Sequence, residues 1–231
     1  MNRATVERSA TDCARVIGQI VSMLPDGVRL AAVSKYHPAE AIQEAYDAGQ
    51  RIFAESRVQE LQGKHEVLPK DIEWHFIGHL QTNKVKYIAP YVSLIHAVDS
   101  LRLLEEISRQ GIRVGRRIPC LLQLHVARED TKFGFSVEEA EAMLDAGAWQ
   151  RMEGAEICGV MCMASHVDDE EQIAREFETA RCFFLRARDR WFANRPSFRE
   201  CSWGMSDDYA IAIEHGSTLV RIGSKIFGQR T

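Results

Sequence analysis

Long hydrophobic runs are missing from this sequence, and so is an excess of charge of one sign. No window of the 231 residues is apolar over the length that a membrane-spanning helix needs. Segment 1–24 mixes charges into an amphipathic pattern and lacks the apolar core of a signal peptide. The net charge is −4, and Lys and Arg are scattered instead of forming the basic stripe of a nucleic-acid binder. We therefore expect a cytoplasmic protein without membrane or nucleic-acid partners.

Cysteine pairs with metal-binding spacing are also missing. The six cysteines include no CxxC pair, and most stand in apolar segments, where cysteine behaves as a small hydrophobic residue. His75 and His79 are four residues apart near a predicted strand end, where they do not share a face, and no Cys/His cluster nearby completes a ligand set. We expect reduced core thiols, no metal site, and hydrogen-bonding roles for these histidines, including lining a binding pocket.

Apolar periodicity predicts a regular alternation of strands and helices. The hydrophobic content of 45% and charged content of 27% are typical of a globular protein with a real core. Short runs rich in Val, Ile and Phe alternate with longer amphipathic segments, which is the pattern of strand–helix units around a parallel sheet. Strands are predicted over 29–34, 51–54, 72–77, 94–98, 118–126, 156–163, 198–203 and 219–222.

Helix-boundary residues support the segments between these strands. Pro38 suits a first helical turn, and Gly49 and Gly147 suit C-terminal caps. Ser136 precedes Glu139 in a capping-box arrangement. One helix is expected before the first strand, and the others over 38–48, 57–65, 82–88, 100–109, 137–146, 170–191 and 207–214.

Eight strands, each followed by a helix except the last, favour a single (β/α)8 TIM barrel with an extra N-terminal helix. The alternative is an open doubly wound sheet, which normally has a glycine-rich turn after its first strand. That turn here reads SKYHP, without glycine. No repeat, low-complexity tract or linker divides the chain, so residues 1–231 are expected to form one domain.

Lys35 is the first candidate for chemistry, because it ends the first predicted strand in VRLAAVSKYHP. The active site of such a barrel lies at the carboxyl ends of its strands. A desolvated amine at this position is able to attack a carbonyl group and form a Schiff base. A surface lysine lying over the barrel rim is the more common role when position is the only evidence.

Two loops near the C-terminus suit a phosphate group. Barrels of this kind often bind phosphate after strands seven and eight, where this sequence has Gly204, Met205 and Ser206, then Gly223 and Ser224. Backbone N–H groups and Ser hydroxyls donate to such a dianion. For either loop alone, a helix N-cap and a turn glycine are equally good interpretations. A Schiff-base lysine together with a phosphate site suggests pyridoxal phosphate.

Arg221 stands inside the last predicted strand between two apolar residues, where a charge needs a partner. If it faces the barrel mouth, it meets a pyridine nitrogen and keeps that nitrogen unprotonated. The ring then becomes a weaker electron sink and a poorer catalyst of carbanion chemistry. An ion pair with a nearby acid is the alternative.

Five motifs carry a resemblance over nearly the whole chain. They are AVSKYHP around Lys35, EWHFIGHLQTNK from Glu73, TKFG from Thr131, GVMCMASH from Gly159, and WGMSDDYAIAIEHGSTLVRIGSKIFGQR from Trp203. With them the chain resembles the pyridoxal phosphate homeostasis proteins of the YggS/PROSC type, which are related to the N-terminal domain of alanine racemases. Two departures are Ala54-Glu55-Ser56, where the family commonly has Gly-Glu-Asn, and Trp203 in place of a frequent methionine.

The resemblance implies a (β/α)8 barrel that holds pyridoxal 5′-phosphate as a Schiff base on Lys35, with Arg221 beside the ring nitrogen. It also implies a carrier or regulator of vitamin B6 pools that affects amino-acid and keto-acid balance indirectly and has no demonstrated catalysis. Members from bacteria are typically monomers, and enzymes that accept the cofactor are the implied transient partners. The resemblance places the phosphate group near Ser202, Met205, Ser206, Gly223 and Ser224.

Two enzymatic functions remain as alternatives. A pyridoxal phosphate-dependent amino-acid racemase needs a second acid–base group opposite the lysine. Alanine racemases take that group, a tyrosine, from a C-terminal domain, whereas only four residues follow Phe227 here. A class I aldolase would use Lys35 on a sugar phosphate and would carry no permanent chromophore. A non-catalytic interaction module predicts no bound ligand at all.

Overall fold

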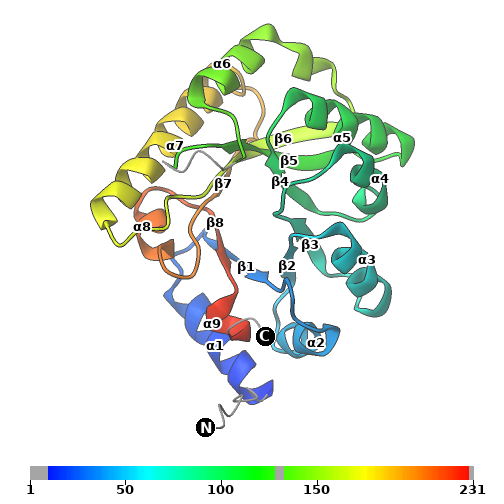
Figure 1. The fold of residues 1–231 in the computed structure, drawn as a ribbon, viewed down its shortest axis with the longest axis vertical. Helices are drawn as coiled ribbons and strands as arrows, with labels where there is room; N and C mark the ends of the chain where they lie inside the picture. Colours follow the sequence, from blue (N-terminus) through cyan, green and yellow to red (C-terminus); the bar gives the residue numbers. More distant parts are fainter. Residues whose placement is uncertain (1–9, 128–132, 229–231) are drawn as a thin grey trace.

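The computed structural model describes residues 10–127 and 133–228, and its centre is a closed barrel of eight parallel strands in sequential order (Figure 1). The barrel closes where β1 pairs with β8, with Ala31 opposite Arg221. This confirms the predicted TIM barrel. The strands are β1 Arg29–Val33, β2 Ile52–Glu55, β3 Glu73–Phe76, β4 Leu94–Val98, β5 Ile118–Leu124, β6 Ala155–Cys162, β7 Glu200–Ser202 and β8 Leu219–Ile222.

Helices surround the barrel, and the expected N-terminal helix packs beside α2 and α9 at the foot of the view in Figure 1. None of the helices within the described ranges is long and apolar enough to cross a membrane. The helices are α1 Ala10–Met23, α2 Ala39–Asp47, α3 Val58–Val67, η1 Thr82–Lys84, α4 Val85–Ile88, α5 Leu101–Arg113, α6 Val137–Ala146, η2 Ala148–Arg151, α7 Glu170–Arg190, α8 Tyr209–Glu214 and α9 Ser224–Phe227.

The predicted helix boundaries agree with the structure at α6 and differ from it at the starts of two other helices. Ser136 and Glu139 form the reciprocal capping box at the start of α6, and Gly147 ends that helix with φ +70°. Pro38 is the N-cap of α2 and does not belong to its first turn. The helix expected from 207 begins at Tyr209, because the residues before it form a turn.

Two apolar layers stabilise the barrel. The outer layer lies between strands and helices and includes Trp74, Phe53 and Phe177. The inner layer consists of small and medium side chains inside the barrel: Ala31, Ile52, Ala54, Leu94, Leu121, Cys158, Met161 and Leu219. Strand alternation therefore sends one set of side chains to the helices and the other to the barrel interior.

The cysteines confirm the expectation of core thiols for five of the six, because only Cys182 is exposed. All six are free, without a disulfide. Burial raises the pKa of Cys162 to about 12, so that it remains an uncharged thiol at neutral pH.

Candidate cofactor-binding site

A cavity of about 240 Å³ opens at the carboxyl ends of the strands, which is where the fold class predicts a site. Its walls combine apolar side chains with an amine, hydroxyl groups and a guanidinium. Six of the seven predicted site residues line this one cavity. Its lining residues are Val33, Lys35, Ile77, Met161, Met163, His166, Met205, Ser206, Asp207, Arg221, Gly223 and Ser224.

Lys35 lies in the tight turn that follows β1. The N–H of Ser34 still donates to Ala54 O at 3.1 Å, which continues the sheet, and the N–H of His37 then donates back to Ser34 O at 3.1 Å. Tyr36, between them, has the left-handed value φ +68°, which is uncommon for a residue other than glycine. This turn places the Lys35 side chain in the wall of the cavity.

Arg221 is the buried cation of the site, with 3% of its surface exposed. Its Nη1 donates to Ser202 O at 2.6 Å and to Ser202 Oγ at 2.7 Å, and its Nη2 donates to Cys162 O at 2.9 Å. No ion pair among the described residues includes Arg221. Burial lowers the pKa of the guanidinium, which nevertheless stays charged because its ordinary value is so high. Neutral oxygens therefore fix a cation at the cavity wall.

Ser202 is the predicted residue that lies elsewhere. It is fully buried inside the barrel, and it is not among the residues that line the cavity. Its hydroxyl contacts His96 Nδ1 at 2.9 Å in addition to Arg221. In this structure Ser202 therefore supports Arg221 from within the barrel.

A pair of buried histidines continues this network. His96 Nε2 lies 3.0 Å from His75 Nδ1. Desolvation lowers the pKa of His75 to about 3 and holds that of His96 well below its ordinary value, so both rings are neutral. Because Arg221 only donates, Ser202 Oγ accepts from it and gives its own proton to His96 Nδ1. His96 then donates from Nε2 to His75, which assigns the tautomers along the chain.

His96 was not predicted as a functional residue. The available signal was weak: a polar residue two positions after the inward-facing Leu94, within the buried run LIHAV. His75 has the hydrogen-bonding role expected of it, but it does not line the cavity. His79 lies at the barrel rim, where its Nδ1 is 2.7 Å from Asp99 Oδ2 and its ring stacks on Phe133.

The loops after β7 and β8 meet through two serine hydroxyls. Ser206 Oγ and Ser224 Oγ are 3.0 Å apart, and both residues line the cavity. The N–H of Met205 already donates to Asp208 Oδ1 at 2.5 Å, which fixes the turn before α8. The hydroxyl groups of Ser206 and Ser224 are the side-chain donors that these two loops supply for an anion.

Close packing explains two of the glycines near this site. Gly204 has φ +91°, and a Cβ there would lie 2.6 Å from Ala212 Cβ. A Cβ on Gly223 would lie 2.9 Å from Val33 O. Trp203, the departure from the family pattern, is fully buried and donates from Nε1 to Ala212 O at 3.2 Å. It therefore packs under α8 and does not line the cavity.

The residues of this cavity fit pyridoxal phosphate by their chemistry. An aldehyde needs an amine, a phosphate group needs hydroxyl donors, and a pyridine nitrogen accepts from a guanidinium. Lys35, the serine pair and Arg221 supply these groups, and Met161 and Met163 add apolar wall. Lys132 and Thr131 of the TKFG motif lie outside the described residues.

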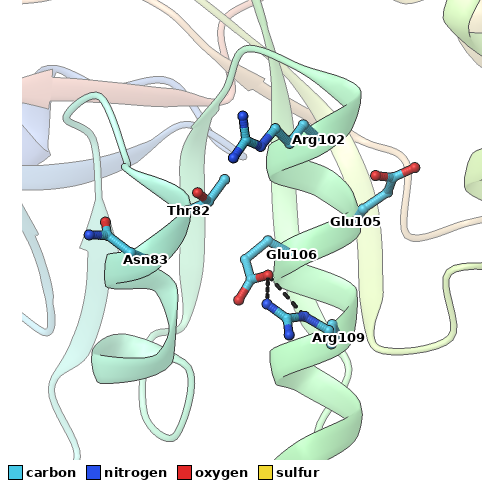
Figure 2. Close-up of a pocket in the computed structure, with 6 residues that line it drawn as sticks. All are labelled: Thr82, Asn83, Arg102, Glu105, Glu106 and Arg109. Atoms are coloured by element: carbon cyan, nitrogen blue, oxygen red, sulfur yellow. Dashed lines mark hydrogen bonds and ion pairs between the residues drawn. The ribbon is translucent and has the colours of Figure 1, made fainter.

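A larger depression, of about 490 Å³, lies between η1 and α5 (Figure 2). Arg102, Glu105, Glu106 and Arg109 supply equal numbers of positive and negative charges to it. Arg109 donates from Nε to Glu106 Oε2 at 3.0 Å, so part of this charge is already paired. No predicted site residue lies there. Its larger volume is not evidence that it binds a carbonyl or a phosphate group.

Comparisons with known proteins find relatives over most of this chain. The alanine racemase N-terminal domain model matches residues 14–231. The pyridoxal phosphate homeostasis protein of Escherichia coli (strain K12) is 35% identical over 235 residues, which cover 99% of this chain and 93% of that protein. Two structures of PipY from Synechococcus elongatus PCC7942, without and with pyridoxal phosphate bound, are 35% and 34% identical, with TM-scores of 0.87 and 0.84. Each covers 94% of this chain and 100% of PipY.

Proposed function

The chain belongs to the pyridoxal phosphate homeostasis proteins, a family with the alanine racemase N-terminal domain, and we propose that it binds pyridoxal 5′-phosphate reversibly and takes part in intracellular vitamin B6 homeostasis. The observation that carries this proposal is the single cavity in which Lys35, Arg221 and the pair Ser206 and Ser224 meet. The cofactor-bound PipY structure supports it through a relative of the same fold.

Four polar side chains of the cavity have a role in the proposal. Lys35 forms a Schiff base with the aldehyde of the cofactor. Ser206 and Ser224 donate to the phosphate group, and Gly223 allows the chain to approach it closely. Arg221 donates to the ring nitrogen. When bound, the cofactor supplies an aldehyde that exchanges between amines and a ring that withdraws electrons.

The guanidinium of Arg221 favours cofactor storage over carbanion chemistry. It holds its proton too firmly to transfer it, so the ring nitrogen that it contacts stays unprotonated and withdraws electrons weakly. A racemase would also need a second acid–base group across the ring from Lys35. The remaining titratable side chains of the cavity are His166 and Asp207. The preference for a holding and releasing role over racemisation therefore rests on Arg221.

The proposal extends to location and partners. On the basis of the family resemblance, we propose that the chain acts in the cytoplasm as a monomer and meets cofactor-accepting enzymes transiently. The barrel already brings six of the predicted site residues together within one chain, so no second subunit is required to assemble those six.

Transfer to an acceptor enzyme tests this function. The protein is loaded with pyridoxal phosphate, freed of excess cofactor and mixed with an apo-aminotransferase. We expect the bound chromophore to fall as aminotransferase activity rises, because a Schiff base exchanges between amines. A Lys35→Ala sample treated in the same way should activate the acceptor no more than buffer does. A chromophore that persists beside an inactive acceptor contradicts the proposed role.

A further inference from the structure

A buried cluster of charges lies directly behind the turn that carries Lys35. Lys64, on α3, has 6% of its surface exposed. Its ammonium group donates to Ser34 O at 2.8 Å, to Glu55 Oε1 at 2.7 Å and to Glu60 Oε1 at 2.6 Å. An ammonium group has three hydrogens, so these three oxygens satisfy it completely.

The same cluster holds the chain on both sides of Lys35. On one side, Ser34 donates from Oγ to Glu55 Oε1 at 2.5 Å, while its carbonyl accepts from Lys64. On the other side, the N–H of Tyr36 donates to Glu60 Oε1 at 2.6 Å. Tyr36 is the residue with φ +68°, and such a conformation persists only where its surroundings enforce it.

We propose that Lys64 is a positioning residue for Lys35: through Ser34, Glu55 and Glu60 it fixes the turn that aims the Lys35 amine into the cavity. This part rests on the proposed function: the same cluster also helps to set the rate at which bound cofactor dissociates. None of the three charged residues lines the cavity, so the effect is transmitted through the backbone.

The composition of the cluster argues for a role beyond packing. Glu55 is fully buried, and its Oε2 has no hydrogen-bond partner within the described part of the chain. Buried ion pairs are seldom more stabilising than apolar residues of the same volume, and an unpaired carboxylate oxygen adds a desolvation penalty. Apolar packing would therefore join β2 to α3 more simply, whereas it would supply no groups to hold the turn.

The charge of this cluster changes near neutral pH. The charged groups that face Glu55 are Lys64 and Glu60, both on α3, and the hydroxyl of Ser34 faces it from the turn. Burial raises the pKa of Glu55 to about 7, Glu60 adds to this effect, and Lys64 and Ser34 oppose it. Protonation weakens the bonds that Glu55 accepts, so the turn is held less firmly at pH 6 than at pH 8.

Lys64→Met tests the inference, with Lys70→Met as the matched control. Lys70 is exposed, and it donates to the carbonyls of His65 and Glu66 at the end of the same helix, without contact to the turn. In cofactor-free protein, Lys64→Met should speed hydrogen–deuterium exchange of the Tyr36 amide about tenfold, because its acceptor Glu60 is released. The dissociation rate of bound pyridoxal phosphate should rise by about the same factor.

The two measurements separate this inference from the proposed function. If Lys64→Met exchanges at Tyr36 like Lys70→Met, the positioning role is wrong, whatever the cofactor does. If exchange rises while even the wild-type protein binds no cofactor, the positioning of the turn stands and the proposed function fails. Faster exchange with an unchanged dissociation rate overturns the link to cofactor retention.

Two further variants cover misfolding and pH. Glu60→Met removes the acceptor of the Tyr36 N–H and leaves the contact between Lys64 and Glu55 in place, so it tests the hold on Tyr36 if Lys64→Met does not fold. Glu55→Gln removes the titrating group. We expect the wild-type dissociation rate to change between pH 6 and pH 8 with a midpoint near 7, and the Glu55→Gln profile to lack this step. The same step in both proteins rules out Glu55 as its origin.

Discussion

The support of Arg221 shows how a single charged residue is held inside a barrel without a carboxylate. A donor-only side chain at one end orders the hydrogen bonds through Ser202 and His96 to His75. This order requires both histidines to be neutral. A protonated His96 would donate to Ser202 as well, and the serine hydroxyl would then receive two donors while its own hydrogen lost this acceptor.

The stability of the protein should therefore carry a histidine-dependent pH profile. The pKa of His75 is about 3 in the folded protein and about 6.5 when unfolded. Below pH 6.5 the unfolded state binds the extra proton, so this contribution to stability is lost as pH falls from 6.5 toward 3. Between pH 7 and pH 5, His75→Gln should remove about 2 kcal/mol of that loss in urea unfolding.

Glu55 provides the control for this prediction, because its contribution to stability changes with pH in the opposite direction. Its pKa is raised to about 7, so its contribution to stability is present at low pH and declines as pH rises between 4.5 and 7. Comparing His75→Gln and Glu55→Gln with the wild-type protein at pH 7 and pH 5 separates the contribution of His75 from that of Glu55. An equal pH dependence in wild type and His75→Gln would contradict the neutral buried pair.

At the level of the elements, two glycines with left-handed backbone, one at the barrel mouth and one before β1, differ in what surrounds them. Gly204 combines a positive φ with a contact that leaves no room for Cβ, while Gly27, after α1, has nearly the same φ of +87° and no atom within 4 Å of a Cβ. Comparing Gly204 with Gly27 therefore separates the cost of the left-handed backbone from the cost of crowding. Crowding at Gly204 involves α8, whose first residue follows the turn that carries Ser206.

Gly204→Ala should therefore destabilise the protein more than Gly27→Ala. We expect about 1 kcal/mol from the left-handed backbone in both variants and about 1–3 kcal/mol more from overpacking in Gly204→Ala alone. Urea unfolding measures the free energies, and the affinity for pyridoxal phosphate should fall only in Gly204→Ala. Equal losses in the two variants would show that the contact with Ala212 is readily relieved.

The elements were predictable to the extent that their signals are local. Apolar periodicity located all eight strands, and the capping box and Gly147 located both ends of α6. The predicted helix over 82–88 is split into η1 and α4, and α8 starts late because the Asp208 carboxylate accepts from Met205 N–H. Such a side-chain bond competes with helix formation and leaves no clear trace in the hydrophobic pattern.

The whole molecule explains which site residues could be inferred in advance. The sequence was enough to propose Lys35, Arg221 and the serine loops, because the strand ends of a barrel converge on one face. The contacts of His96 with Ser202 and of Lys64 with Ser34 join residues that are 106 and 30 positions apart. Pairings of this kind depend on barrel closure and helix packing, so local sequence does not reveal them.

The closed barrel joins the cavity at its mouth to the support on its outer face. Its mouth gathers one amine, one buried cation and two hydroxyls in a cavity with apolar walls, and its outer face holds the turn of the amine in place through α3. This arrangement suits a protein that holds pyridoxal phosphate through Lys35 and releases it.

The most direct test is the absorption spectrum of the purified protein mixed with pyridoxal phosphate, followed by borohydride reduction and peptide mass mapping, with Lys35→Ala in parallel. We expect a visible Schiff-base band and a reduced adduct on Lys35, both lost in the variant. A missing band, or an adduct on another lysine, would contradict the proposal.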